Sequence, residues 1–334
     1  MSRVSIIINN YNYERFLRDA IDSALAQDYG DCEVIVVDDG SSDASPEVIH
    51  AYGERIIPIF QPNGGQGAAM NAGFAASSGE WVLFLDADDF LKSSAVSQLL
   101  EDVKKGVSKI QFRLICVDAS SDPTGKYNPP ERLSMPSGDL TERMLREGSY
   151  LGSPTSGNLF SRRYLNAIMP MEVSEYRICA DRYLNTLAPF RGQILSHASS
   201  LGYYRLHGGN NFMNQCYSED QIITQIQRLQ KKRKLIIEEV RRLGLDETNV
   251  YAITDKYHAL RLAGLRLSPQ SYPVENDTKM KILAGAVKAS LSQIINRPFW
   301  AVSRSFMYAL QSFLPSRLVR KSLLRSATPN RGLV

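Results

Sequence analysis

Three clusters of polar residues in the N-terminal part of the sequence each follow an apolar run. The clusters are Asn9-Asn10-Tyr11-Asn12, Asp38-Asp39-Gly40-Ser41 and Asp86-Ala87-Asp88-Asp89. A single acidic residue after a strand is often only a helix cap. In an open α/β sheet, however, the carboxyl ends of the strands meet at one edge, and ligands bind there. We therefore expect the three clusters to line one binding site.

The third cluster has the composition of a metal site. Asp86 and Asp88 are two positions apart, so their side chains project to the same side of an extended chain. Two carboxylates held that close repel each other unless a cation lies between them. Mg²⁺ and Mn²⁺ prefer oxygen ligands and commonly share them with substrate phosphates. The sequence therefore predicts a divalent metal, Mn²⁺ or Mg²⁺, at Asp86 and Asp88.

The runs around these clusters predict the elements that position them. Apolar runs predict strands at residues 4–9, 33–38, 56–61, 81–86 and 109–117. Apolar or small residues at helical spacing predict helices at residues 16–25, 67–77 and 93–104. A buried parallel strand is apolar on both faces, as residues 82–85 are. Alternating strands and helices predict an α/β fold with a mostly parallel central sheet.

The rest of the chain changes in character. Residues 119–138 are rich in Ser, Pro, Asp and Gly and predict a long loop. Short helices near 140–146 and 162–168 and a strand at 192–205 follow. Helical patterns then dominate, at residues 218–243, 249–267, 277–296 and 299–325. We expect an α/β domain at residues 1–215, with halves at 1–118 and 119–215, and a helical region at 216–334.

The charge of the chain is unevenly distributed. Residues 219–334 contain 20 Lys and Arg but only 9 Asp and Glu, whereas the preceding part is acidic. The segment 297–325 mixes basic residues with aromatic and aliphatic ones. Such helices lie at an anionic membrane surface, or they pack as a bundle that forms a homodimer. The sequence pattern leaves both alternatives open.

The bulk composition excludes several classes of protein. Hydrophobic residues make up 43% and charged residues 22%, as in a folded globular protein. The four cysteines show no paired spacing of a zinc or disulfide framework. We find no signal-peptide layout, no apolar stretch of about 20 residues and no nucleic-acid-binding module. The expected location is the cytoplasm, with peripheral attachment to the inner face of the membrane as the second option.

The ordered motifs resemble those of glycosyltransferase family 2, the inverting enzymes with a GT-A fold, over about residues 3–210. The matching pieces are residues 4–12 with 24–27, residues 36–43, residues 67–73 and residues 84–89. The resemblance implies transfer of a sugar from a nucleotide-diphosphate donor, with a UDP-sugar favoured, to a glycan or lipid-linked acceptor in polysaccharide or glycan assembly. Residues 1–118 would then be the nucleotide-binding half of the domain, and residues 119–215 the acceptor-side half.

The resemblance implies roles for residues that would contact the nucleotide. Tyr11 would lie against the nucleobase, and Asp39 together with Asp38 would accept a hydrogen bond from it. Asn71 corresponds to a family asparagine near the nucleotide. The family usually has an arginine before this asparagine, whereas this chain has Met70.

Further roles concern the diphosphate and the metal. By the same resemblance, Asp86 would lie by the ribose and the metal, and Asp88 would be the principal metal ligand. His207 would reach the metal or the diphosphate, and Arg205 would contact phosphate. A histidine at such a position is otherwise a surface or core residue.

The acceptor side carries the expected general base. The resemblance matches Asp181 to the acidic residue that deprotonates the acceptor, with Ala180 where the family often has a second acid. The alternative is a helix aspartate paired with Arg177 at the preceding turn. Ser156 and Asn158 would line the acceptor side.

Other functions were weighed against this one. The glycine-rich stretch at residues 63–73 lacks the spacing and position of a dinucleotide-binding loop, although its helix N-terminus can face a nucleotide. A nucleotidyltransferase would carry a basic glycine-rich loop after the first strand, which this chain lacks. The remaining alternative is a non-catalytic nucleotide-sugar-binding or scaffold protein, which Met70 and Ala180 would fit.

Overall fold

The computed structural model describes residues 2–101, 103–207, 218–247, 250 and 255–291, and beyond them only Met307, Gln311, Pro315 and Arg320. The chain forms two compact units. Unit 1 consists of residues 1–141 and 150–210, and unit 2 of residues 142–149 and 211–334. The predicted domain limits at residues 118 and 215 remain predictions.

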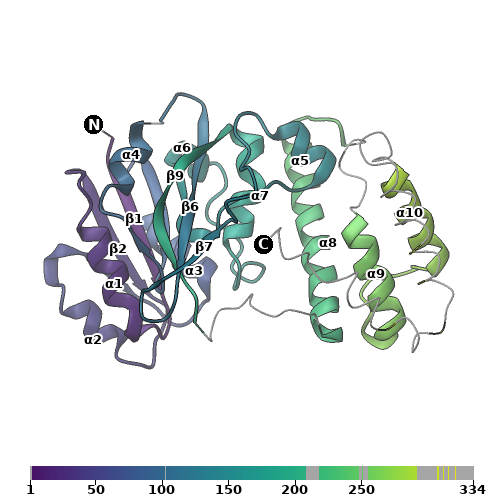
Figure 1. Ribbon diagram of the computed structural model, residues 1–334, viewed down its shortest axis with the longest axis horizontal. Coiled ribbons are helices and arrows are strands. Elements are labelled where there is room, and N and C mark those ends of the chain that lie inside the picture. The colour runs from purple at the N-terminus through teal and green to yellow at the C-terminus, as the bar shows by residue number, and fades with distance from the viewer. Residues whose placement is uncertain are drawn as a thin grey trace. The chain divides into compact units, whose positions relative to one another are not determined.

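Unit 1 is built on a sheet that has nine strands within the described residues, in the order β3-β2-β1-β4-β8-β6-β9-β5, with β7 paired to β6 (Figure 1). The strands are β1 (Val4–Asn10), β2 (Cys32–Asp38), β3 (Ile57–Phe60), β4 (Trp81–Asp86), β5 (Phe90–Leu91), β6 (Val107–Val117), β7 (Pro123–Asn128), β8 (Asn158–Ser161) and β9 (Gln193–Arg205).

The sheet has a parallel half and a mixed half. Strands β3, β2, β1 and β4 are parallel, as predicted. Strand β8 then runs antiparallel to both β4 and β6, while β6 and β9 are parallel to each other. Strands β7 and β5 are antiparallel to their neighbours. The sheet is therefore less uniformly parallel than predicted, because a second set of strands extends it beyond β4.

Helices cover both faces of the parallel half. The helices of unit 1 are α1 (Glu14–Leu25), α2 (Ser45–His50), α3 (Gln66–Ala76), α4 (Ala95–Glu101), α6 (Arg162–Asn166) and α7 (Asp181–Arg191). Successive residues of a strand point to opposite faces. Ile6 shares an apolar cluster with Leu17 and Ile21 of α1. Ile7 faces the other way and contacts α3 at Gly73.

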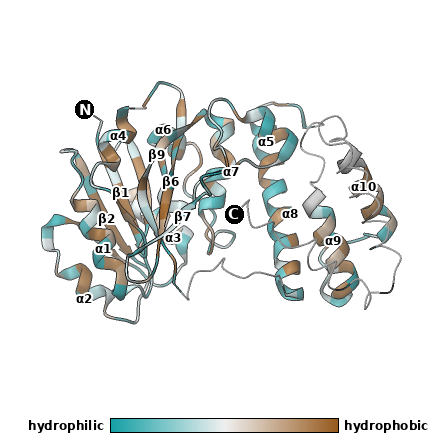
Figure 2. Ribbon diagram, viewed as in Figure 1, coloured by the Kyte–Doolittle hydropathy of each residue, from teal (hydrophilic) through white to brown (hydrophobic). Residues whose placement is uncertain are grey.

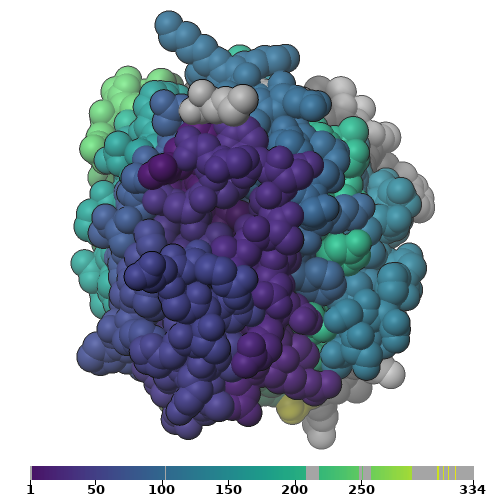
Figure 3. All heavy atoms as spheres, turned by 90° about the vertical axis from the view of Figure 1, so that its left-hand side faces the viewer, coloured from purple at the N-terminus to yellow at the C-terminus, as the bar shows by residue number. Residues whose placement is uncertain are grey.

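The hydropathy of the chain follows this arrangement. Figure 2 shows β1 and β2 coloured hydrophobic along most of their length, whereas α1 alternates between the two colours, as expected of a helix with one buried side. Figure 3 looks onto the side where N-terminal residues, drawn purple, form the surface.

Unit 2 is helical in its described part. Its helices are α5 (Thr141–Glu147, the first residue of which belongs to unit 1), α8 (Glu219–Arg242), α9 (Asp255–Leu267) and α10 (Lys279–Leu291). Ser218 and Gln221 form a capping box that starts α8, because each side chain accepts a hydrogen bond from the other residue's backbone N–H. Ile226, Leu260 and Ile282 share an apolar cluster that joins α8, α9 and α10.

Most predicted elements are present, but the predicted loop at 119–138 contains β7. The first part of the predicted helix at 249–267 lies outside the described residues, apart from Val250, and the rest is α9 from Asp255. The predicted helix at 299–325 and the end of the one at 277–296 lie outside the described residues, apart from single positions. No helix in the described ranges is both long and apolar enough to cross a membrane.

Gly73 provides a test of this packing. A Cβ at this position would lie 2.3 Å from Cγ2 of Ile7, inside contact distance. We expect Gly73→Ala to lower the free energy of unfolding by about 1–3 kcal/mol, because α3 must move off the sheet. Urea unfolding followed by circular dichroism measures this.

The matched control is Gly30→Ala, since a Cβ at Gly30 meets no atom within 4 Å. We expect this variant to stay within about 0.5 kcal/mol of the unmodified protein. Equal stability of the two variants would contradict the close packing of α3.

Candidate active site

Three carboxylates lie at the end of β4 and in the turn that follows it. The backbone N–H of Asp89 donates to the carbonyl oxygen of Asp86 at 3.0 Å, and Asp88 lies between them. Burial, and then the charge of Asp88, raise the pKa of Asp86 to about 7. Burial and the charges of both other aspartates also raise the pKa of Asp89 well above its ordinary value. The turn therefore concentrates negative charge that the surroundings must offset.

Asp89 is held from two sides. Its carboxylate accepts a hydrogen bond from the backbone N–H of Arg205 at 3.0 Å and another from the hydroxyl of Ser156 at 2.6 Å. The Ser156 oxygen also accepts from the backbone N–H of Asp86 at 3.1 Å. Ser156 is fully buried, so it fastens the aspartate turn to the segment before β8. Its place on the acceptor side stays a prediction.

The guanidinium of Arg205 supports the same turn. Its side chain is 1% exposed, and Nε donates to the carbonyl oxygen of Asp88 at 2.9 Å. One terminal nitrogen lies 2.6 Å from Asp19, and the group stacks over the rings of Phe16 and Phe90. Such a buried guanidinium stabilises the turn from inside, and the contact of Arg205 with phosphate stays a prediction.

His207 and Asp88 are brought together as a pair. The Nε2 atom of His207 lies 2.9 Å from Oδ2 of Asp88, and both side chains are mostly buried. The imidazole packs edge-on against Tyr13. Burial and the negative charges of the aspartate turn raise the pKa of Tyr13. Asp88 and His207, both predicted to act on the metal, thus lie side by side at the aspartate turn.

The side chains at this turn fit a divalent cation by their chemistry. Within the described part of the chain, no group of three His, Cys, Asp or Glu side chains is arranged so that it could hold a metal ion. However, Asn9 donates to Asp86 at 2.9 Å, and its own buried side-chain oxygen has no hydrogen-bond partner there. Carboxylate and amide oxygens with one imidazole suit Mn²⁺ or Mg²⁺. Asp86, Asp88 and His207 remain the predicted ligands of the ion.

The ends of β1 and β2 are tied together beside this turn. The buried carboxylate of Asp38 accepts hydrogen bonds from Asn10 at 2.8 Å and from the hydroxyl of Ser41 at 2.6 Å. Asn12 adopts a left-handed backbone conformation with φ of 58°. Tyr11, between the two asparagines, is 48% exposed. Its ring is thus available at the predicted nucleotide edge, whereas Asp38 mainly holds the loops.

Asp39 shapes the glycine-rich turn. One carboxylate oxygen accepts from the Gln61 side chain at 2.6 Å and from the backbone N–H of Gly64 at 2.8 Å. The other accepts from the backbone N–H of Gly65 at 2.6 Å. Any contact of Asp39 with a nucleobase would therefore add to bonds that already fix the loop.

Asn71 has a structural contact that the sequence did not predict. Its side chain donates to the carbonyl oxygen of Met171 and accepts from the backbone N–H of the same residue, both at 2.9 Å. Met70 is fully buried. Asn71 thus fastens the segment before α7 to α3, and its predicted place near the nucleotide is a separate role.

Asp181 is the first residue of α7. Cys179, two residues earlier, has a φ of 61°, a backbone conformation that non-glycine residues rarely adopt. Burial raises the pKa of Asp181, although Arg182 and Lys109 oppose the shift. Its charge in turn contributes to raising the pKa of Asp86, so the two carboxylates interact electrostatically.

A glutamine connects Asp86 to Ala180, the residue before Asp181. The side chain of Gln66 donates to Asp86 at 3.2 Å and accepts from the backbone N–H of Ala180 at 3.0 Å. Arg177 donates to Asn63, and the structure describes no ion pair between Arg177 and Asp181. Pairing of Asp181 with Arg177 is thus absent from the described contacts, whereas the charge of the neighbouring Arg182 acts on Asp181 and opposes the rise that burial causes in its pKa.

Asn158 is the first residue of β8. It is fully buried, and its side-chain nitrogen donates to the carbonyl oxygen of Pro154 at 2.6 Å. Like Ser156, it holds the turn before β8 in this structure, whereas the sequence predicted that it lines the acceptor.

Lys109 is a buried cation that the sequence analysis missed. It lies on β6 with no exposed surface, and Nζ donates to Asn185 at 2.7 Å. Nζ also lies 5.0 Å from the centre of the Tyr150 ring. Burial lowers the pKa of Lys109 to about 7, partly opposed by the charge of Asp181. The available signal was a lysine at the start of the predicted strand 109–117.

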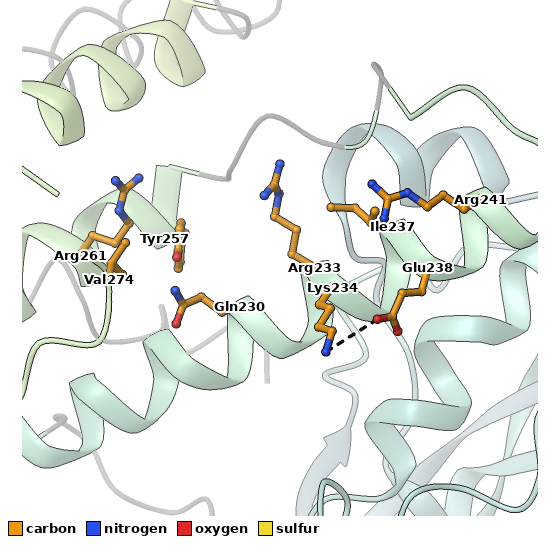
Figure 4. Close-up of a pocket in the computed structure, with 9 residues that line it drawn as sticks. All are labelled: Gln230, Arg233, Lys234, Ile237, Glu238, Arg241, Tyr257, Arg261 and Val274. Carbon is orange, nitrogen blue, oxygen red and sulfur yellow. Dashed lines mark ion pairs between the residues drawn. The ribbon is translucent and has the colours of Figure 1, made fainter. Parts of the chain in front are cut away.

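A pocket of about 520 Å³ in unit 2 is a weaker candidate. Figure 4 shows its walls, formed by α8, α9 and Val274. Three of its four basic side chains already pair with carboxylates, namely Lys234 with Glu238, Arg241 with Glu247 and Arg261 with Asp277. The pocket is therefore close to neutral, and we place the active site in unit 1.

Comparison with known proteins agrees with this placement. The family model "Glycosyl transferase family 2" matches residues 5–168. The chain is 40% identical over 221 residues to an uncharacterized glycosyltransferase of Nostoc sp., a match that covers 64% of this chain and 67% of the relative.

Two solved structures are similar to the whole chain. One is TarS 1–349 of S. aureus in complex with UDP-GlcNAc, with 17% identity, a TM-score of 0.57 and coverage of 97% of this chain and 89% of TarS. The other is the mannosyltransferase PcManGT of Pyrobaculum calidifontis with GDP-Man and Mn²⁺, with 16% identity, a TM-score of 0.50 and coverage of 96% and 88%. The predicted fold is thereby confirmed as that of the GT-A transferases. Within this class the chain belongs to glycosyltransferase family 2, and it is a glycosyltransferase.

Lys109→Met tests the cost of the buried cation. The pKa of Lys109 falls from 10.5 in the unfolded chain to about 7 in the folded protein. Below pH 7 Lys109 is protonated in both the folded and the unfolded chain, and burying its charge lowers the free energy of unfolding by the full amount. Between pH 7 and about 10.5 the unfolded state binds more protons, so the penalty declines as pH rises.

We expect Lys109→Met to raise the melting temperature at pH 6 by about 2–4 °C, the shift that roughly 1 kcal/mol produces in a domain of this size. The gain should shrink at pH 9. Differential scanning fluorimetry across this range measures it, with Lys126→Met on exposed β7 as the control. A gain that does not depend on pH would contradict the assigned pKa.

Proposed function

We propose that the protein transfers a sugar from a nucleotide-diphosphate donor to an acceptor hydroxyl, with inversion at the anomeric carbon. The proposal rests on one observation. A single glutamine side chain bridges Asp86 and the start of the helix that carries Asp181. A carboxylate that can accept a proton and carboxylates that can bind a cation therefore lie at neighbouring positions of one sheet edge.

In the proposed mechanism Asp181 is the general base. It accepts the proton of the acceptor hydroxyl while that oxygen attacks the anomeric carbon and the bond to the diphosphate breaks. Burial raises the pKa of Asp181, which makes the carboxylate a stronger base than an exposed aspartate. A single displacement of this kind inverts the configuration of the sugar.

Asp88, Asp86 and His207 are the proposed holders of Mn²⁺ or Mg²⁺. The ion, when bound, supplies Lewis-acid stabilisation of the departing diphosphate. The protein's contribution is to hold the carboxylates in place, through Ser156 and Arg205 below the turn.

We propose a UDP-sugar as the donor, with GDP- and dTDP-sugars as alternatives. The half-exposed ring of Tyr11 offers a stacking surface for the base, beside the loops that Asp38 and Asp39 hold. TarS was crystallised with UDP-GlcNAc, and PcManGT with GDP-Man and Mn²⁺, which supports a nucleotide-sugar donor. The proposed product is a polysaccharide or another glycan built on a lipid-linked or glycan acceptor.

Unit 2 is proposed to bring the enzyme to an anionic membrane surface. Lys231, Arg233 and Lys234 on α8 are exposed. Basic side chains on a helix are attracted to anionic lipid headgroups. The resulting location is the cytoplasmic face of the membrane, and homodimerisation through the C-terminal helices is the competing role.

Two aspartate substitutions separate the proposed roles. We expect Asp181→Asn to slow sugar transfer by about 10²–10⁴-fold while donor affinity changes little, because only proton acceptance is lost. We expect Asp88→Asn to slow transfer by at least about 10²-fold and to weaken Mn²⁺-dependent donor binding. Release of nucleoside diphosphate from a panel of nucleotide sugars, with and without Mn²⁺, measures transfer.

Calorimetric titration with the nucleoside diphosphate measures donor binding. The matched control is Asp28→Asn, since Asp28 is exposed near the amino end of β2. Near-normal transfer by Asp181→Asn would show that another group is the base, and binding without turnover by the unmodified protein would favour a non-catalytic role.

Vesicle flotation tests the proposed membrane surface. We expect the full chain to float with vesicles containing anionic phosphatidylglycerol and not with pure phosphatidylcholine, and binding to weaken as salt increases. Arg233→Glu combined with Lys234→Glu should reduce flotation severalfold. Unchanged flotation, together with a dimer in light scattering, would instead support the homodimer.

A further inference from the structure

The glycine-rich turn before α3 is shaped to receive a second chain segment. The backbone N–H of Gln66 donates to the carbonyl oxygen of Arg177 at 2.9 Å, and that of Gly67 donates to Tyr176 at 3.1 Å. A Cβ at Gly65 would lie 2.4 Å from the Arg177 carbonyl oxygen. A Cβ at Gly67 would lie 2.5 Å from that of Tyr176. Both glycines are thus required for this close approach.

The segment that contacts the glycine-rich turn, Tyr176 and Arg177, precedes α7, the helix that carries the proposed base. After Arg177 the chain passes through Cys179 with its left-handed φ of 61°, and α7 starts at Asp181. Ala180 is the N-cap residue and has no side chain that can cap the helix. The start of α7 therefore depends on contacts from outside the helix.

Gln66 supplies such a contact, and its orientation is determined by its partners. The backbone N–H of Ala180 can only donate, so the atom 3.0 Å away is the side-chain oxygen of Gln66. The side-chain nitrogen then points to Oδ1 of Asp86 at 3.2 Å, where the carboxylate can only accept. Asn9 donates to the same oxygen at 2.9 Å. The side-chain amide of Gln66 is thus hydrogen-bonded to Asp86 through its nitrogen and to Ala180 through its oxygen.

We propose that Gln66 is a positioning residue that couples the donor-side carboxylate Asp86 to the start of α7, and thereby sets the position of Asp181. This inference rests on the proposed function of the same site. The coupling requires both ends of the amide. A side chain that only accepts would hold Ala180 without Asp86, and an apolar side chain of the same length would hold neither.

Two substitutions at this position test the inference. Gln66→Met keeps the length of the side chain and removes both bonds, whereas Gln66→Glu keeps an acceptor for Ala180 and loses the donor to Asp86. We expect each to lower the turnover number for transfer by about 10- to 100-fold, the loss that a base misplaced by roughly 1 Å produces. The affinity for nucleoside diphosphate in the presence of Mn²⁺ should change less than about threefold in Gln66→Met.

The matched control is Gln98→Met, because the side chain of Gln98 bonds only within its own part of the chain, to Ser94 at 2.8 Å. We expect its transfer rate to equal that of the unmodified protein. Near-normal transfer by Gln66→Glu would overturn the coupling and leave only a capping contact.

A double-mutant cycle distinguishes positioning from general structural support. If Gln66 acts through Asp181, then Gln66→Met should slow transfer by less than about twofold when Asp181→Asn is already present. Additive losses would overturn the inference.

Hydrogen exchange tests, without any measurement of turnover, whether Gln66 holds the start of α7. We expect amides of residues 178–184 to exchange at least about tenfold faster in Gln66→Met than in the unmodified protein, and to be unchanged in Gln98→Met. Unchanged exchange in Gln66→Met would overturn the inference. Failure of the unmodified protein to use any nucleotide sugar would defeat the proposed function alone, since the exchange result stands by itself.

Discussion

The accumulation of negative charge at the end of β4 is the constraint on which the rest of unit 1 depends. Three aspartates within four residues would repel one another if the turn were held only by its own backbone. Arg205, from the end of β9, and Ser156, from the turn before β8, provide the hydrogen bonds that hold it. The mixed half of the sheet thus completes a site whose carboxylates come from the parallel half.

This arrangement divides the polar residues into two groups. Arg205, Ser156 and Asn158 are almost fully buried, and their described contacts hold backbone or other side chains in place. Tyr11, by contrast, exposes about half of its surface. Buried polar groups are mostly hydrogen-bonded within the protein, so the first group holds the site in place, whereas the ring of Tyr11 is accessible from outside. Asp86, Asp88 and Asp181 are partly buried.

Much of the fold follows from local patterns. The runs at β1, β2 and β4 are apolar on both faces, which is characteristic of strands buried between helices, and the structure contains them almost at the predicted limits. Strand β7 lies in the predicted loop, because residues 119–138 are rich in Ser, Pro, Asp and Gly and residues 123–128 carry no apolar alternation. Strand β5 has only two residues, too few for any periodic signal.

The sequence by itself showed that polar clusters follow the parallel strands β1, β2 and β4, and which residue types form the aspartate turn. Both features lie in short, contiguous motifs. It could not determine which polar side chains form hydrogen bonds inside the protein that hold the site together. Arg205 lies 116 positions from Asp89, and Gln66 lies 114 positions from Ala180. Only the tertiary fold brings such pairs within hydrogen-bonding distance, and only burial then decides whether a side chain supports the site or faces the substrate.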